Sequence, residues 1–293
     1  MKNLITRTIF GVLFVVIMVG GIIWRPDSFI LLFAIITGMT IWEYTGLVNS
    51  KGIDVNRFIS TVAGVYFYLA VAAWCIGLTD GFIVFVPYVI TIIYLFISEL
   101  YLKHKDPIGS WAYTMLGQMY IAIPFSLINL LAFGITDSSS EPSYNWLLPL
   151  SLFIFLWAND TGAYCVGSML GKHRLFARIS PKKSWEGSIG GAILVMLIAY
   201  AIGYTNNMTL YDADSQPALF SASLGIAEWM GLGAAVVVFG TWGDLVESLF
   251  KRTLGIKDSG NVIPGHGGML DRFDSSLMAI PAAVAYLYTI AMI

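Results

Sequence analysis

Apolar stretches long enough to cross a membrane recur along nearly the whole chain, and short polar breaks separate them. A helix needs about 20 mainly apolar residues to span a hydrocarbon core of about 30 Å. By that measure we predict transmembrane helices over Thr8–Trp24, Phe29–Leu47, Ser60–Leu78, Phe82–Leu102, Trp111–Phe133, Trp146–Leu170, Ser188–Tyr204, Glu228–Phe250 and Ser275–Ile293. The predicted fold class is therefore all-α, a polytopic integral membrane protein with about nine transmembrane helices.

Charged residues make up 12% of the chain, against about 25% in an ordinary soluble domain. This scarcity excludes a soluble globular enzyme. The 16 basic and 18 acidic residues nearly cancel, so we expect no nucleic acid as a partner. Cys75 and Cys165 lie in apolar runs without metal-ligand spacing, which favours buried thiols over a disulfide or a metal site. With no internal repeat or soluble domain, residues 1–293 are predicted to form a single membrane domain.

The basic residues are distributed very unevenly between the two sides that nine spans would create. If the amino terminus is cytoplasmic, Arg25 alone faces outward and 15 of the 16 Lys and Arg residues face inward. Cytoplasmic loops of membrane proteins carry such an excess, so the sequence predicts a cytoplasmic amino terminus. Lys2 and Arg7 also fit a signal peptide, but no small-residue cleavage site follows them, which favours a retained first helix.

Ionisable residues inside predicted spans are costly, and each requires an explanation. Glu43 and Glu99 lie near the inner ends of their spans, where the plain interpretation is that their side chains reach the interface. Asp160 instead lies in the middle of the sixth span beside Asn159, and we expect it to face a wet or polar cavity. The alternative is an interhelical hydrogen bond through Asn159, with Asp160 protonated.

The eighth predicted span ends in a polar face. Asp244, Glu247, Ser248 and Lys251 follow the helical i, i+3, i+4, i+7 spacing and therefore share one side. Two carboxylates within the apolar zone are not expected to face lipid. A salt bridge from Asp244 or Glu247 to Lys251 or Arg252 is the alternative to a functional role.

The loop before the ninth span, Lys257–Asp274, carries the densest group of reactive side chains. Glycines flank His266 and leave the backbone open to close approach by a ligand. Asp271 and Asp274 are one helical turn apart where the last span begins, so their side chains are expected to converge. With Asp244 they form a hard oxygen-ligand set that suits Mg²⁺ rather than zinc. For Asp274 alone, capping of the last helix is the alternative.

A second basic loop, Ser180–Gly187, opens the seventh span. Lys182 and Lys183 lie beside the amino terminus of a predicted helix, which is a favourable place for an anion such as a phosphate. Positive-inside topology and attraction to anionic lipid would equally explain the two lysines. Ser184 and Glu186 are alternatively helix-capping residues.

Three segments of the carboxyl-terminal half resemble motifs of the phosphatidate cytidylyltransferases, also called CDP-diacylglycerol synthases. They are Asn159-Asp160, Ser180-Pro-Lys-Lys-Ser-Trp-Glu-Gly187 and, with the fullest agreement, Ser248-Leu-Phe-Lys-Arg252, Lys257-Asp258, Gly260, Ile263-Pro264 and His266-Gly-Gly-Met-Leu-Asp-Arg-Phe-Asp274. The resemblance covers residues 141–293 in detail, as a catalytic half with cytoplasmic loops 171–187 and 251–274. Residues 1–140 match only as a series of spans.

The resemblance implies the reaction of CTP with phosphatidate to give CDP-diacylglycerol and pyrophosphate. It implies an enzyme of the inner membrane whose active site faces the cytoplasm, so that CTP arrives from the cytoplasm and phosphatidate from the inner leaflet of the bilayer. It also implies a Mg²⁺ centre on Asp244, Asp271 and Asp274, with room for a second cation, since family members are associated with paired metals. A homodimer is a further expectation, because many membrane enzymes dimerise.

The same resemblance implies roles for the basic residues around that centre. Triphosphate or pyrophosphate is expected on Lys251, Arg252 and Arg272. The remaining substrate contacts are expected from Lys182, Lys183, Ser184, Lys257 and Asp160, with His266 orienting a phosphate or a carboxylate. No general base is needed, because the attacking lipid phosphate is already ionised at neutral pH.

Other functions fit the sequence less well. A CTP-dependent lipid-alcohol kinase would transfer the γ-phosphate, but the complete pattern from His266 to Asp274 favours cytidylyl transfer. The Asp-Gly-x-x-Ala-Arg cluster of CDP-alcohol phosphotransferases is absent. Outside the enzymes, a cation-coupled transporter with Asp160 and Asp244 in its ion pathway is the alternative.

Overall fold

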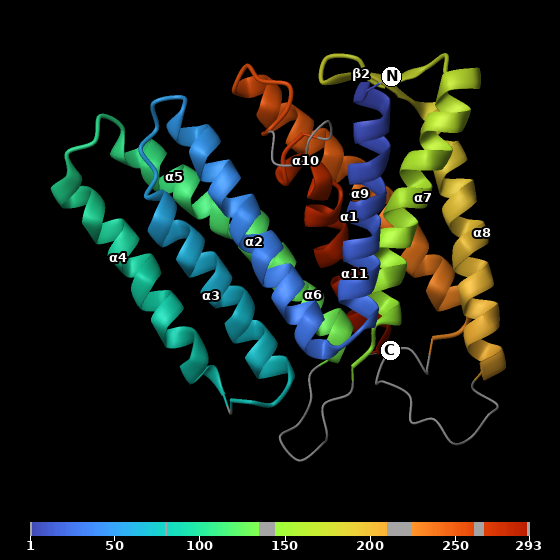
Figure 1. The fold of residues 1–293 in the computed structure, drawn as a ribbon, viewed down its shortest axis with the longest axis horizontal. Helices are drawn as coiled ribbons and strands as arrows, with labels where there is room; N and C mark the ends of the chain where they lie inside the picture. The colour runs from blue at the N-terminus through green and yellow to red at the C-terminus, as the bar shows by residue number, and fades with distance from the viewer. Residues whose placement is uncertain (1, 80, 135–143, 210–223, 261–266, 292–293) are drawn as a thin grey trace. The chain divides into compact units, whose positions relative to one another are not determined.

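A computed structural model describes residues 2–79, 81–134, 144–209, 224–260 and 267–291, and most of them are helical (Figure 1). The helices are α1 (Lys2–Ile23), α2 (Pro26–Asn49), α3 (Arg57–Cys75), η1 (Phe82–Phe85), α4 (Val86–Leu102), α5 (Pro107–Gly117), η2 (Gln118–Ala122), α6 (Ile123–Phe133), α7 (Leu147–Leu170), α8 (Trp185–Thr209), α9 (Ile226–Thr253), α10 (Leu270–Phe273) and α11 (Ser276–Ala291). Two short strands, β1 (Arg174–Phe176) and β2 (Ser180–Ser184), complete the elements.

Each of the nine predicted spans overlaps a helix or a consecutive run of helices in this structure. In the described part of the chain, seven helical segments are long and apolar enough to cross a membrane, as expected of a multi-pass membrane protein. The other two are α1, whose described apolar part, Thr8–Ile23, is shorter, and α7, which carries Asn159 and Asp160 in its middle. The predicted helical membrane fold is therefore confirmed, and the count of nine spans stays a prediction.

Local chemistry sets the predicted breaks between helices. Asn56 caps α3, because its side chain accepts a hydrogen bond from the backbone N–H of Ile59. Asp106 caps α5 through the N–H of Gly109, and Pro107 occupies the first helical position, where a missing N–H costs nothing. Both caps lie in the polar breaks between predicted spans, and capping depends only on residues close in the chain.

The described chain divides into two compact units that do not follow the order of the sequence. Unit 1 consists of the described residues within 1–130 and 253–273, and unit 2 of those within 131–134, 144–252 and 274–291. The motif between the eighth and ninth predicted spans thus leaves unit 2 at Thr253, belongs to unit 1 through Phe273, and returns to unit 2 at Asp274.

In unit 1, an aromatic cluster fixes α10 among the amino-terminal helices. The Phe273 ring lies 5.5 Å from that of Phe125 in α6 and 5.9 Å from that of Phe14 in α1, measured between ring centroids. Phe125 in turn lies 6.4 Å from Phe33 in α2. Phe33, Phe125 and Phe273 are fully buried, and offset or edge-on pairs of this kind add to the stabilisation from burial.

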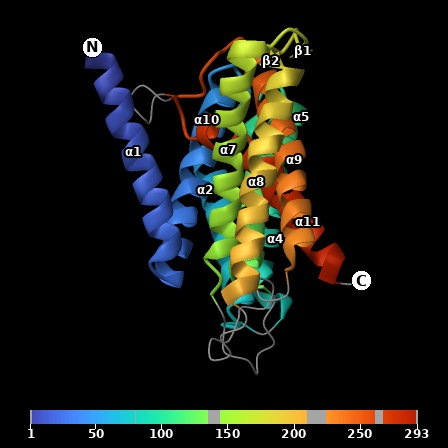
Figure 2. The ribbon, with the colours of Figure 1, turned by 90° about the vertical axis from the view of Figure 1, so that its right-hand side faces the viewer.

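In unit 2, α7 and α8 run side by side along their length (Figures 1 and 2). Glycines make this approach close: a Cβ atom added at Gly162 would lie 2.9 Å from the carbonyl oxygen of Gly190 and 2.9 Å from the Cα of Gly191. Small residues let membrane helices approach until their backbones are in contact. The α7–α8 pair therefore forms a rigid wall for the side chains that project from it.

The loop between α7 and α8 contains an antiparallel hairpin, which the all-α prediction did not include. Arg174 in β1 pairs with Ser184 in β2. Glu186, at the start of α8, accepts hydrogen bonds from the backbone N–H groups of Lys172 and His173 at 3.2 Å, and its carboxylate lies 2.6 Å from the His173 Nδ1. Glu186 thus ties the base of the hairpin to α8, in place of the helix-capping role considered for it.

Candidate active site

A cavity of about 540 Å³ that carries charged side chains lies within unit 2, between α7, the hairpin, the start of α8 and α9. Its lining residues are Asn159, Asp160, Ala163, Tyr164, Gly167, Ser168, Gly171, Arg174, Pro181, Lys182, Lys183, Ser184, Gly187, Ser188 and Thr241. Four of them, Asp160, Lys182, Lys183 and Ser184, are predicted substrate-binding residues. The structure therefore brings together residues from two separate predicted segments, the sixth span and the second basic loop.

Asp160 and Asn159 have different environments, although they are neighbours in α7. Asp160 is exposed and faces the cavity, as predicted for a carboxylate in the middle of a span. Asn159 is buried and its Nδ2 donates to Thr241 Oγ1 in α9 at 3.4 Å, which is the interhelical contact considered as the alternative. Among the described residues, Asn159 Oδ1 has no hydrogen-bond partner, so this wall of the cavity presents a buried acceptor.

Ser184 performs the local role that the sequence offered as an alternative. Its Oγ accepts a hydrogen bond from the backbone N–H of Gly187 at 3.2 Å, so it caps α8 while it lines the cavity. The amino terminus of α8 and the side chains of Lys182 and Lys183 therefore face the same space. Partial positive charge from the helix and full charge from the lysines make this part of the cavity suited to a phosphate.

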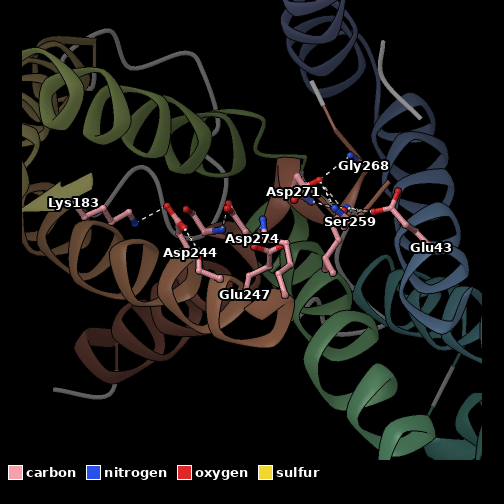
Figure 3. A network of polar contacts seen from close by, with 12 residues as sticks. Glu43, Lys183, Asp244, Glu247, Ser259, Gly268, Asp271 and Asp274 are labelled. Atoms are coloured by element: carbon pink, nitrogen blue, oxygen red, sulfur yellow. Dashed lines mark hydrogen bonds and ion pairs between the residues drawn. The ribbon is translucent and has the colours of Figure 1, made fainter. Parts of the chain in front are cut away.

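Lys183 connects the basic hairpin with the polar face of α9. Its Nζ lies 2.5 Å from Asp244 Oδ2, and the two side chains are 27% and 26% exposed (Figure 3). Ser248, one turn further along α9, donates its hydroxyl to Asp244 Oδ1 at 3.2 Å. Asp244 therefore lies beside the cavity, where the Lys183 ammonium group and the Ser248 hydroxyl bind its carboxylate. It does not face lipid as an unpaired charge.

The salt bridge considered as an alternative forms between Glu247 and Lys251. The Lys251 Nζ lies 2.7 Å from Glu247 Oε2, and the Glu247 side chain is fully buried. This pair accounts for the second carboxylate in the apolar part of α9, because a buried charge is tolerated when it is paired. A phosphate bound by Lys251, as predicted, would therefore have to compete with Glu247 for the ammonium group.

Asp274 is close to the carboxylates of α9. A Cβ atom at Gly243 would lie 2.7 Å from the Asp274 carbonyl oxygen, so glycine is what allows the backbones to approach. The side chains of Asp244 and Glu247 lie near that of Asp274 (Figure 3), and Asp160 also acts electrostatically on the Asp274 carboxyl group. Its Oδ1 accepts a hydrogen bond from the N–H of the adjacent residue, Ser275, at 2.5 Å. A helix-capping side chain instead accepts from the N–H two or three residues later, so this bond is not a cap.

Asp271 lies in unit 1 and is hydrogen-bonded to the loop before it. Its Oδ2 accepts bonds from Ser259 N at 2.8 Å, Ser259 Oγ at 2.9 Å and Gly268 N at 2.9 Å. The predicted convergence of Asp271 with Asp274 assumed one continuous helix. That assumption is wrong, because α10 ends at Phe273 and α11 begins only at Ser276.

The other predicted basic residues of the motif are solvent-exposed: Arg252, Lys257 and Arg272. Lys257 and Arg272 belong to unit 1 and Arg252 to unit 2. His266 lies outside the described residues.

The donor set around α9 fits a divalent cation of the Mg²⁺ type. No three His, Cys, Asp or Glu side chains of the described residues are grouped as a metal-binding cluster. Mg²⁺, however, usually retains several waters and uses one or two carboxylates together with substrate phosphates, rather than a cage made by the protein alone. Asp244 and Asp274, both in unit 2, are two carboxylates that would fit such a site.

Sequence reasoning missed five polar residues of the cavity, Tyr164, Ser168, Arg174, Ser188 and Thr241. Arg174 counted only toward the topology, because its pairing with Ser184 depends on the unpredicted hairpin. Tyr164 and Ser168 follow Asp160 at i+4 and i+8 on α7, so their helical spacing was a signal that could have placed them on the same face.

Comparison with known proteins agrees with the motif resemblance. A profile of the Cytidylyltransferase family matches residues 5–290. A protein named phosphatidate cytidylyltransferase from Haemophilus influenzae is 31% identical over 284 residues, which cover 92% of this chain and 93% of that protein. Proteins of the same name from Staphylococcus aureus and Staphylococcus haemolyticus are 44% and 41% identical over 134 residues, 45% of each chain. Since the family profile spans both compact units and all the motif segments, this chain belongs to the cytidylyltransferase family.

Proposed function

We propose that this protein is a phosphatidate cytidylyltransferase, which transfers CMP from CTP to phosphatidate and releases pyrophosphate. The observation that carries the proposal is the cavity of unit 2, which gathers Lys182, Lys183 and Arg174 at the amino terminus of α8. The ion pair between Lys183 and Asp244 places a carboxylate beside that cationic group. Cations for phosphate groups and carboxylates for a metal are what transfer between two phosphorylated substrates requires.

In the proposed reaction, a phosphate oxygen of phosphatidate attacks the α-phosphorus of CTP. The new P–O bond forms as the bond to the bridging oxygen of pyrophosphate breaks, so negative charge grows on the leaving group. Lys182, Lys183 and Arg174 neutralise that charge and hold the substrate phosphates in line. No proton has to be removed from the nucleophile, because the lipid phosphate is already ionised.

Asp244 and Asp274 are the residues that we propose to hold Mg²⁺. When bound, the metal would act as a Lewis acid on phosphate oxygens. Asp160, which faces the cavity, is the carboxylate that we propose for a second cation. Asp271, whose Oδ2 is bound by Ser259 and Gly268, keeps its metal role as a prediction.

We also propose that the active site opens to the cytoplasm from the inner membrane. The support is the positive-inside rule, since the cationic residues of the cavity belong to the loop that the charge distribution places inside. CTP is then taken from the cytoplasm and phosphatidate from the adjacent leaflet. The homodimer stays a prediction.

The experiment uses purified protein in phosphatidate-containing liposomes with Mg²⁺ and CTP labelled at either the α- or the γ-phosphate. Transfer of α-label into chloroform-soluble lipid, with γ-label recovered as pyrophosphate, is the expected result. Transfer of γ-label to a lipid acceptor would instead identify a kinase. If both labels stay in CTP while cations move across the liposome membrane, the protein is a transporter and the proposal fails.

A further inference from the structure

Glu43 is a buried carboxylate in the amino-terminal half for which the proposed reaction has no use. The sequence suggested that its side chain reaches the interface. That interpretation is wrong: Glu43 is 9% exposed and its carboxylate is bound by the loop of the carboxyl-terminal motif (Figure 3). Oε1 accepts bonds from Ser259 Oγ at 2.5 Å and Leu270 N at 3.1 Å, and Oε2 accepts one from Met269 N at 2.9 Å.

Ser259 lies between two carboxylates of unit 1. Its Oγ is 2.5 Å from Glu43 Oε1 and 2.9 Å from Asp271 Oδ2. A hydroxyl carries one proton, so Ser259 donates to one carboxylate at a time, and backbone amides supply the other bonds. We call this set, Glu43, Ser259 and Gly268–Asp271, the carboxylate clasp.

Two glycines of the motif make room for Glu43. A Cβ atom at Gly260 would lie 2.7 Å from Glu43 Oε2, and one at Gly268 would overlap the same carboxylate. From the sequence, the glycines around His266 predict the close approach of an external ligand. In the structure, the group that approaches it is the protein's own carboxylate from α2.

The energetics of the clasp favour one loop geometry. A buried carboxylate is strongly unfavourable unless hydrogen-bond donors surround it, and charge-assisted bonds to backbone N–H groups are about twice as strong as neutral ones. Any shift of residues 268–270 would break bonds to Glu43 and leave a buried charge poorly solvated. The clasp therefore fixes the backbone immediately before Asp271 and Arg272.

We infer that Glu43 is a positioning residue for the transfer reaction, acting through the motif loop and not on the substrate. This inference rests on the proposed function. Asp274 follows Asp271 by three residues in the chain, so the segment that Glu43 and Ser259 hold leads directly into a proposed metal ligand. In this way a residue of the amino-terminal half, outside the motif segments, contributes to catalysis.

The test compares Glu43→Gln with Glu99→Gln in the liposome assay. Glu99 is an ideal control because it lies in the same unit, is also 9% exposed, and pairs with His104 at 2.8 Å away from the motif. We expect Glu43→Gln to lower kcat about 10- to 100-fold, the scale of a small misplacement of catalytic groups, with little change in KM for CTP. Glu99→Gln should leave kcat unchanged.

Two further variants separate positioning from simple loss of folding. Glu43→Asp keeps the charge on a shorter side chain and should recover part of the lost kcat. Ser259→Ala should lower kcat by a smaller factor in Glu43→Gln than in the wild type, because the effects of substitutions in one hydrogen-bond network are not additive. Amide hydrogen exchange at Met269 and Leu270 should accelerate in Glu43→Gln, with the rest of unit 1 unaffected.

The inference is overturned if Glu43→Gln turns over like Glu99→Gln, or if its activity falls only in proportion to the yield of folded protein. Accelerated exchange throughout unit 1 would likewise indicate a purely structural role. Failure of the wild-type protein to transfer α-label would instead refute the proposed function. The hydrogen-exchange comparison reports on the clasp independently of that outcome.

Discussion

Lys183 in β2 and Asp244 in α9 form a 2.5 Å ion pair that connects the basic hairpin with the acidic face of the longest helix. Lys183 also lines the cavity, so a phosphate bound there would compete with Asp244 for the same ammonium group. Release of Asp244 from this pair would free a carboxylate for a metal ion. The ion pair therefore couples the two parts of the proposed site.

Replacement of Lys183 tests the phosphate-binding part of the cavity. Lys183→Ala should lower kcat/KM about 10- to 100-fold, as expected when a charge-assisted hydrogen bond of about 1.5–3 kcal/mol is lost. Lys183→Arg should retain more activity because it keeps the charge. Steady-state kinetics with CTP measure the effect. Lys172→Ala is the control, since Lys172 is exposed and does not line the cavity, and an equal loss there would contradict a specific role for Lys183.

Asp244 and Asp274 should be required for metal-dependent turnover. Asp244→Asn and Asp274→Asn each remove a negative oxygen ligand, and we expect losses of about 10²- to 10³-fold, comparable with the removal of one electrostatic group from an active site. Chelation of Mg²⁺ should abolish wild-type activity, and readdition should restore it. Asp54→Asn, in an exposed loop of unit 1, is the control, and its activity should depend on Mg²⁺ concentration as that of the wild type does. Full activity of either site variant would exclude that residue as a ligand.

Asp271→Asn should abolish turnover while membrane insertion survives. This substitution replaces one carboxylate oxygen by an NH2 group and removes the negative charge. The single oxygen that remains cannot both accept the bonds from Ser259 and Gly268 and bind a metal. Transfer of α-label and the yield of membrane-extracted protein are the two measurements. Near-normal activity would refute the metal role predicted for this residue.

Larger side chains at the glycines between α7 and α8 should destabilise the protein. Gly162→Ala places a methyl group against the backbone of Gly190 and Gly191 and should destabilise the protein by about 1–3 kcal/mol, the usual cost of overpacking. A thermal unfolding scan in detergent measures the decrease in Tm. Gly20→Ala is the matched control, because no atom lies within 4 Å of the added Cβ in α1. If both variants have the same Tm, the close approach of α7 and α8 is not a constraint.

The topology prediction can be tested with reporter fusions. Fusions after Lys172 and after Asp137 should report opposite sides of the membrane, with Lys172 inside, because one predicted span separates them. An enzymatic reporter active only in the cytoplasm, paired with one active only outside, gives complementary signals. Identical results at both positions would contradict the nine-span arrangement.

The sequence by itself determined the features that depend on local pattern. Apolar length predicted the helices, because hydrophobic burial acts over short stretches of chain, and the polar breaks between the spans hold the caps Asn56 and Asp106. Motif spacing predicted the family, which the comparisons confirm. It also predicted four residues that the cavity brings together.

The tertiary structure alone decided which polar residues meet. Asp244 pairs with Lys183 rather than with its helical neighbour Lys251, and Glu43 is bound by Ser259, far away in the chain. Such contacts depend on helix packing and on hydrogen-bond geometry, neither of which leaves a periodic trace in the sequence. A charge near the end of a span looks the same whether it reaches the interface or closes a buried network. Only packing distinguishes the two, because it determines which donors surround the carboxylate.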